Sequence, residues 1–133
     1  MKRINTFDID GVIYLGSDLT GVFPGVHDHI ITGRSVDEEE YTLEMLRDRG
    51  IFNPVHFNPI RFDQKTRESS GAHKAIIIQK LKQQGYDIGV HFEDDEVQIE
   101  VIKSIHPDLK IVHLVSNLVN KENQWNDDRK NEQ

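Results

Sequence analysis

Acidic side chains gather at the ends of two apolar runs, residues 4–9 and 88–92, and could bind a metal ion there. The acids are Asp8 and Asp10 at the first run and Glu93, Asp94 and Asp95 at the second. Two carboxylates separated by one residue point the same way in an extended strand, and a third acid nearby adds repulsion that a bound cation relieves. Mg²⁺ suits one or two carboxylates that share it with water and a phosphate. The acids therefore predict a magnesium site that handles a phosphate group.

A hydroxyl, a glycine and a lysine supply the remaining groups that a bound phosphate needs. Thr32 ends the apolar run 26–32 and can donate a hydrogen bond to a phosphate oxygen, assisted by backbone amides around Gly33 and Gly11. Lys74 lies near the start of a predicted helix, where its ammonium would hold the phosphate and balance the acids. Thr32, Gly33 and Lys74 are therefore the candidate substrate-binding residues.

Short strands alternating with amphipathic helices must position these residues. The predicted strands cover 4–9, 26–32, 55–57, 88–92 and 111–115, and the predicted helices cover 35–50, 72–84 and 96–104. Ser35 and Glu38 have the spacing of a capping box, and Gly50 supplies the stop of that helix. We expect a loop or short hairpin at 16–25 and a polar loop at 61–71. The alternation predicts a parallel sheet with right-handed crossovers, whose site lies beyond the carboxyl ends of the strands.

Four short segments resemble the motifs of the haloacid dehalogenase superfamily, in that family's order and over residues 3 to about 115. They are Phe-Asp-Ile-Asp-Gly-Val at 7–12, Ile-Thr-Gly-Arg at 31–34, Lys74, and Phe-Glu-Asp-Asp at 92–95. The resemblance implies a three-layer α/β/α Rossmann-like fold with a parallel five-stranded sheet in the order 5-4-1-2-3. Neither the segment from Asp10 to Thr32 nor that from Thr32 to Lys74 has room for an inserted cap domain. Residues 11–25 would instead form a short helical turn and a hairpin flap beside the site.

The resemblance also implies a role for each residue. Asp8 would be the nucleophile that forms an aspartyl-phosphate, and Asp10 the general acid and base. Mg²⁺ would be held by Asp8, the backbone carbonyl of Asp10, and Asp94, with Glu93 and Asp95 as alternatives to Asp94. The implied activity is magnesium-dependent hydrolysis of a phosphomonoester.

Ordinary structural roles compete with these assignments. Asp8 and Asp10 could be solvated turn residues, Lys74 an exposed helix lysine, and the acids at 93–96 the first turn of a helix. Arg34 is better explained as a solvent-facing or salt-bridged residue than as a substrate clamp. His73 either touches the substrate or faces solvent.

Two further groups of residues have a functional and a structural explanation. His27 and His29 would share one face of a strand and could bind zinc. However, no third and fourth ligand follows at a spacing typical of zinc sites. Arg61, Lys65 and Arg67 could guide an anionic substrate, although a solvated loop explains them better.

Composition limits the remaining choices. The chain of 133 residues fits one domain, 1–119, followed by a polar tail, 120–133, around Trp125. Cysteine is absent, which excludes disulfides and thiolate metal sites. No apolar run approaches the ~20 residues of a membrane span, and no signal-peptide core follows the basic pair near the start, so we expect a cytoplasmic protein.

The expected partner is a phosphorylated small molecule or a nucleotide. An open site is compatible with the terminal phosphate of a nucleic acid, but the net charge of −7 opposes that partner. Two other functions use the same residues: a non-catalytic binding or assembly module, and a phosphotransferase with an acceptor other than water. The oligomeric state has no signature in the sequence.

Overall fold

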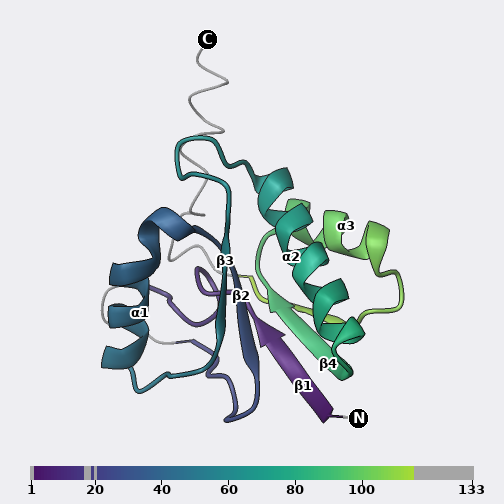
Figure 1. Ribbon diagram of the computed structural model, residues 1–133, viewed down its shortest axis with the longest axis horizontal. Coiled ribbons are helices and arrows are strands. Elements are labelled where there is room, and N and C mark those ends of the chain that lie inside the picture. Colours follow the sequence, from purple (N-terminus) through teal and green to yellow (C-terminus); the bar gives the residue numbers. More distant parts are fainter. Residues whose placement is uncertain (1, 17–18, 20, 116–133) are drawn as a thin grey trace.

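The computed structural model describes residues 2–16, 19 and 21–115, which form an α/β fold around a parallel sheet (Figure 1). The strands are β1 (Lys2–Phe7), β2 (His29–Ser35), β3 (Val55–Asn58), β4 (Tyr86–Glu93) and β5 (Ile111–His113). The helices are the 3₁₀ turn η1 (Val36–Glu38), α1 (Glu39–Asp48), α2 (Arg67–Gln83) and α3 (Glu96–Ile105). Among the described residues, no helix has both the length and the apolar character that a membrane crossing requires.

The five strands lie in the order β3-β2-β1-β4-β5, and every neighbouring pair is parallel. Read from the β5 edge, this order is 5-4-1-2-3. The chain moves outward from β1 to β3 and then crosses back to β4, so the order reverses between β1 and β4. In open parallel sheets, ligands bind beyond the carboxyl ends of the strands at such a reversal. The predicted parallel α/β architecture is confirmed.

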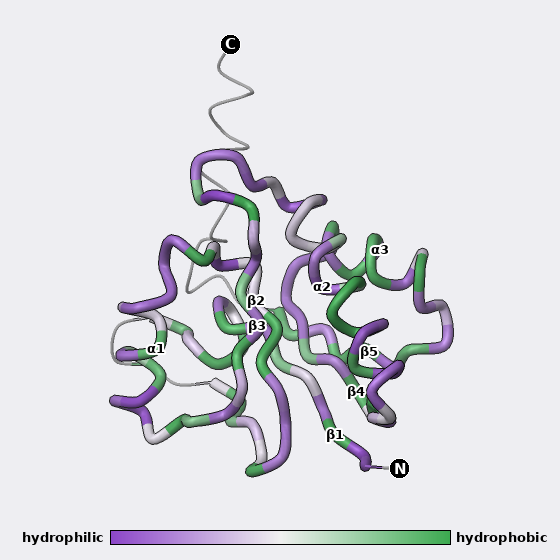
Figure 2. Tube along the Cα trace, viewed as in Figure 1, coloured by the Kyte–Doolittle hydropathy of each residue, from purple (hydrophilic) through white to green (hydrophobic). Residues whose placement is uncertain are grey.

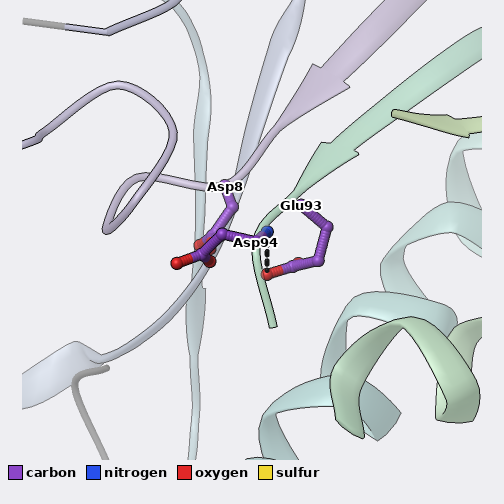
Figure 3. A group of neighbouring side chains, drawn as sticks. All are labelled: Asp8, Glu93 and Asp94. Atoms are coloured by element: carbon purple, nitrogen blue, oxygen red, sulfur yellow. Dashed lines mark hydrogen bonds between the residues drawn. The ribbon is translucent and has the colours of Figure 1, made fainter. Parts of the chain in front are cut away.

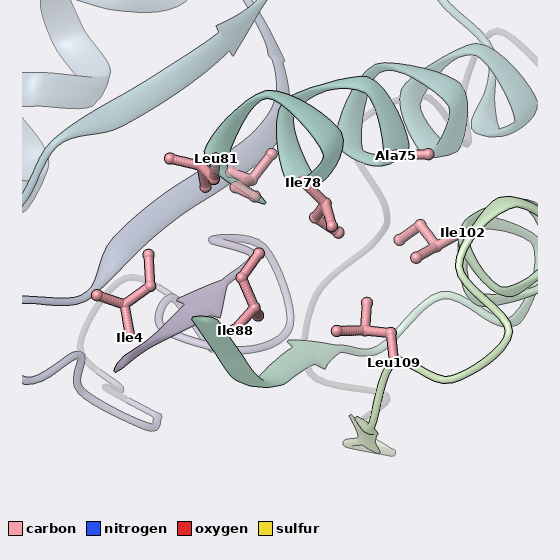
Figure 4. Packing of buried hydrophobic residues seen from close by; sticks show 8 residues of the cluster. Ile4, Ala75, Ile78, Leu81, Ile88, Ile102 and Leu109 are labelled. Carbon is pink, nitrogen blue, oxygen red and sulfur yellow. The ribbon is translucent and has the colours of Figure 1, made fainter. Parts of the chain in front are cut away.

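Helices cover the two faces of the sheet and bury a separate apolar cluster on each. On one face, Ile4 of β1 and Ile88 of β4 pack with Ile78 of α2 and Ile102 of α3 (Figure 4). On the other face, Phe7, Ile30 and Leu46 belong to the cluster that α1 helps to enclose. Figure 2 shows that the connection from β3 to α2, at the top of the view, is mostly hydrophilic, as the polar composition of that loop predicts.

Several element boundaries differ from the prediction. Helix α2 begins at Arg67, five residues before the predicted start, because Thr66 and Ser69 form a reciprocal capping box. Strand β1 ends at Phe7 rather than at residue 9, and β2 spans His29–Ser35 rather than 26–32. The predicted capping box of Ser35 and Glu38 is confirmed, although the first turn it opens is 3₁₀. The predicted tail and Trp125 lie outside the described residues.

A β-bulge in β4 determines which side chains of that strand face α2. Ile4 pairs with Ile88, but Thr6 pairs with His91, so β4 contains one residue more than β1 over this stretch. The side-chain oxygen of Asn5 accepts a hydrogen bond from the backbone amide of Val90 at 3.1 Å and thereby supports the bulge. Because a single extra residue reverses the alternation, β4 buries Ile88, His91 and Glu93 rather than every second residue from 88.

A second irregularity lies in β2 and releases the carbonyl of Gly33 from the strand ladder. Ile31 pairs with His56 and Ser35 pairs with Asn58, so four steps along β2 match two along β3. The Gly33 carbonyl accepts a hydrogen bond from Lys65 Nζ at 3.1 Å and one from Asn58 Nδ2 at 3.4 Å. These side chains replace the missing ladder partners of a buried carbonyl.

Three histidines lie together between the sheet and α2. His29 Nδ1 is 2.9 Å from His56 Nε2, the two rings stack, and His73 Nε2 contacts the His56 carbonyl at 3.2 Å. Burial lowers the pKa of His56 and of His73 to about 4, and it also lowers the pKa of His29. The prediction that His73 faces solvent is therefore wrong, because it is buried, whereas contact with a substrate stays a prediction. The zinc hypothesis gains no support, since no histidine belongs to a metal-binding group in the described residues.

We predict that stability decreases as the pH falls from about 6.5 to about 4. The unfolded chain binds protons at His56 and His73 in this range, whereas the folded chain does not until near pH 4, so each histidine lowers stability by up to about 1.4 kcal/mol per pH unit. Urea unfolding at pH 7 and pH 5 should show a smaller difference for His73→Gln than for wild type. His27→Gln, at an exposed position, is the control, and an unchanged difference in His73→Gln would contradict the prediction.

Candidate active site

A buried chain of polar side chains links the ends of β1 and β4 to α2. Lys74 Nζ lies 3.0 Å from Asp8 Oδ1 and 2.7 Å from Glu93 Oε1. His91 Nε2 lies 3.1 Å from the same Glu93 oxygen, and its Nδ1 lies 2.8 Å from the hydroxyl of Thr6. Each of these five side chains is at most 1% exposed. Because buried charges are costly unless they are paired and hydrogen-bonded, this network fixes the orientation of Asp8.

Three carboxylates meet at the reversal point of the sheet. Ligand oxygens of Asp8, Glu93 and Asp94 lie within 4.8 Å of one another, and Figure 3 shows the three side chains at the ends of β1 and β4. Asp94 is the partly exposed member, whereas Asp8 and Glu93 are buried. Glu93 Oε1 is held by Lys74 and His91, so Asp94 marks the side from which a ligand reaches the group.

Asp95 has a structural role instead. Its carboxylate caps α3 by accepting a hydrogen bond from the backbone amide of Val97 at 2.9 Å. It also accepts a hydrogen bond from the side-chain amide of Gln98 at 3.1 Å. Arg67 pairs with both of its carboxylate oxygens. Asp94 was the predicted metal ligand after β4, with Glu93 and Asp95 as alternatives. The structure brings Glu93 and Asp94 together with Asp8, whereas Asp95 caps α3.

Gly11 allows Asp94 to approach the turn that follows β1. Its φ is +84°, and a Cβ at this position would lie 1.8 Å from Asp94 Oδ2. A side chain at position 11 would therefore both strain the backbone and displace the Asp94 carboxylate.

Asp10 forms a buried ion pair with Arg34 of β2. The strand ends at Phe7, and the amides of Ile13 and Tyr14 turn back to the carbonyl of Ile9, so the expected extended spacing of Asp8 and Asp10 is not present. The Asp10 carboxylate instead accepts two hydrogen bonds from Arg34, at 2.9 Å from Nε and 2.7 Å from Nη2. The interpretation of Arg34 as a salt-bridged residue is confirmed, and the pair is buried.

Thr32 and Gly33 lie at the irregular end of β2. The hydroxyl oxygen of Thr32 accepts a hydrogen bond from the backbone amide of Arg34 at 3.0 Å, and Thr32 is fully buried. Beside them, Lys65 pairs with Glu38 at 3.1 Å and donates to the Gly33 carbonyl. Lys65 is fully buried, so the prediction of a solvated loop is wrong for it, whereas Arg61 is exposed as expected.

Several ion pairs gather around this edge of the sheet. Four cations pair with acids there, and the ion pairs are Arg34 with Asp10, Lys65 with Glu38, Arg67 with Asp95, and Lys74 with both Asp8 and Glu93. Asp94 adds a sixth carboxylate to the group.

Sequence reasoning missed four residues that hold the candidate site together. They are Thr6, Thr42, Asn58 and His91. Thr6 and His91 support Glu93, Thr42 accepts a hydrogen bond from Arg34, and Asn58 donates to the Gly33 carbonyl. A polar residue within an otherwise apolar segment could have marked these positions. Their partners could not be predicted, because the pairing between strands contains two irregularities.

We predict that Lys74→Met lowers stability by about 3–5 kcal/mol, because it leaves the buried carboxylates of Asp8 and Glu93 without their cation. Thermal and urea unfolding in the presence of chelator would measure the loss. Lys80→Met, at an exposed position of the same helix, is the control. Equal stability of the two variants would contradict this account of the network.

The chain was also compared with known proteins. No protein-family model matches it, and no curated protein matches its sequence.

Proposed function

We propose that this protein is a magnesium-dependent phosphatase of the haloacid dehalogenase type, without a cap domain, that hydrolyses a phosphomonoester. The observation that carries the proposal is the position of Asp8. It follows β1 directly at the reversal point of the sheet, with Lys74 on one carboxylate oxygen and the acids that follow β4 beside it. This arrangement combines a carboxylate in a fixed orientation, a cation-binding group and a lysine.

The residues present fit a magnesium ion. Carboxylate oxygens are the ligands that Mg²⁺ prefers, and the oxygens of Asp8, Glu93 and Asp94 lie within 4.8 Å of one another. Asp8, Asp94 and the backbone carbonyl of Asp10 would hold the ion, with Glu93 behind them against Lys74. When bound, the ion would neutralise negative charge on the phosphate and help to orient it.

The residues of the chain would then act in two steps. In the first, a carboxylate oxygen of Asp8 attacks phosphorus, the bond from phosphorus to the leaving oxygen breaks, and Asp10 gives its proton to that oxygen. In the second, Asp10 takes a proton from water as the water oxygen attacks phosphorus, and Asp8 is released together with phosphate. Lys74 fixes Asp8 throughout, and Thr32 and the amide of Gly33 bind phosphoryl oxygens.

The same charges favour a small substrate. The four cations at this edge of the sheet already pair with carboxylates, so a polyanion gains little from them. A phosphorylated small molecule or a nucleotide therefore suits the site better than the end of a nucleic acid.

We predict that wild type hydrolyses an aryl phosphate with Mg²⁺, and that chelator or Asp8→Asn lowers the rate by about 10³-fold or more. Initial rates of phosphate release would measure this. Asp63→Asn, at an exposed side chain, is the control for surface charge. Undiminished activity in Asp8→Asn would refute the proposal.

Two further outcomes would replace hydrolysis by another function. Phosphorylated alcohol products, formed when alcohols are added, would indicate a phosphotransferase. A wild type that is silent on all phosphomonoesters, and that fails to bond BeF₃⁻ at Asp8, would indicate a binding module.

We also predict that Gly11→Ala weakens Mg²⁺ binding by at least about tenfold, because the new Cβ displaces the Asp94 carboxylate. Titration calorimetry with Mg²⁺ would measure the affinity. Gly50→Ala is the matched control, since Gly50 also has a positive φ, +76°, but no atom lies within 4 Å of its added Cβ. Equal affinities in the two variants would exclude Asp94 as a ligand.

A further inference from the structure

A groove of about 350 Å³ lies between helix α2 and the edge strand β3 with the residues that follow it. Phe57, Pro59, Ile60 and Ile76 contribute to its apolar lining. Ile76 is 53% exposed although it belongs to a helix that packs on the sheet. Clefts that bind small molecules usually enclose roughly 300–1,000 Å³ and combine apolar walls with a few polar groups. The size and lining of this groove therefore suit a small, largely apolar molecule.

His73 of α2 gives the groove a hydrogen-bond acceptor in a fixed orientation. Its ring lines the groove, and only 7% of the residue is exposed. Its Nε2 lies 3.2 Å from the carbonyl oxygen of His56, and because a carbonyl can only accept, Nε2 carries the ring proton. Burial lowers the pKa of His73 to about 4, so the ring is neutral at pH 7. Nδ1 of His73 is then an acceptor.

This acceptor is available to a ligand. Within the described part of the chain, the contact with His56 is the one hydrogen bond of the His73 ring. The enclosed side-chain atoms that lack a partner there belong to Arg49 and Gln98, so Nδ1 of His73 is not enclosed and reaches the open space. A ligand that displaces water from Nδ1 has to offer a donor, because a buried acceptor without a partner is unfavourable.

A cation stands further along the same side of the groove. Lys80 follows His73 by seven residues, which places both on one face of α2, about 10 Å apart along its axis. Helix side chains lean toward the N-terminus, so the ammonium of Lys80 points back toward His73. Lys80 lines the groove, is exposed, and forms no ion pair with any residue that the structure describes. The groove therefore offers an acceptor, an apolar middle and a positive charge in that order.

We propose that the groove between β3 and α2 binds a small aromatic acid whose ring system carries an N–H donor, such as an indole carboxylate. The ring packs against Ile60 and Ile76, its N–H donates to Nδ1 of His73, and its carboxylate faces Lys80. An aliphatic amine fits less well, because its positive charge is repelled by Lys80. This inference goes beyond the proposed phosphatase and does not depend on it.

The test compares three ligands that differ by one group: indole-3-acetate, 1-methylindole-3-acetate and indole-3-acetamide. Titration calorimetry measures each affinity, and shifts of backbone amide resonances locate the site. We expect N-methylation to weaken binding about tenfold, since it removes the donor and leaves Nδ1 without a partner. Replacing the carboxylate by the amide should cost about threefold, as is typical of an exposed ion pair.

Variants assign each difference to its residue. The side-chain amide of Gln in His73→Gln can still donate to the His56 carbonyl but supplies no acceptor in place of Nδ1, so the preference for the N–H ligand should disappear. Lys80→Gln should abolish the preference for the carboxylate alone. Lys103→Gln, at an exposed position of α3, is the control and should keep both preferences. Ile76→Glu, also at an exposed position, should abolish binding of indole-3-acetate even if His73→Gln folds poorly.

Absence of saturable binding by wild type would overturn the proposal. Equal affinities for indole-3-acetate and its N-methyl analogue would do so too, as would resonance shifts that lie away from residues 57–60 and 69–80. None of these outcomes bears on the Asp8-dependent hydrolysis, so the two proposals succeed or fail separately.

Discussion

The ammonium of Lys74 between the carboxylates of Asp8 and Glu93 is the interaction on which the rest of the site depends. All three groups are buried, and their separate transfer from water would be strongly unfavourable. Their pairing therefore couples β1, β4 and α2 at a single point. The apolar cluster beneath α2 sets the distance over which Lys74 must reach, and the bulge in β4 sets the direction of Glu93. A change in the packing of the core would therefore also change the geometry of the site.

The sequence contains enough information for the parallel sheet and the edge at which the acids gather. The periodicity of apolar residues and the capping signals are local, and they predicted the strands and most of the helices within a few residues. The start of α2 was predicted too late because Thr66 and Ser69 cap it reciprocally within a segment whose polar composition resembles a loop. Local patterns therefore predicted the elements better than their ends.

Side-chain direction at the site was harder to predict because it depends on pairing between strands. The bulge of β4 and the irregularity of β2 change which residues face inward, and nothing in either strand alone reveals them. The same limit applies to Asp10. An extended strand would direct it alongside Asp8, but the chain turns after Phe7 and Asp10 meets Arg34 from β2. The sequence was sufficient to select the candidate residues by their types. The residues they pair with could be identified only from the structure.

The hydrogen bond from Lys65 to the Gly33 carbonyl has a consequence for how this chain can be altered. Surface loops usually accept inserted segments at little thermodynamic cost, and the polar connection from β3 to α2 looks suited to carry one. Lys65 anchors the last part of that connection to the strand that holds Thr32 and Arg34. Because the amides of Gln64 and Lys65 donate to the carbonyl of Arg61, a segment inserted between Arg61 and Lys65 would disturb this anchor. A segment inserted between Lys65 and Thr66 would separate the anchor from the helix that carries Lys74. The connection from β3 to α2 is therefore less tolerant of an inserted domain than its polar composition suggests.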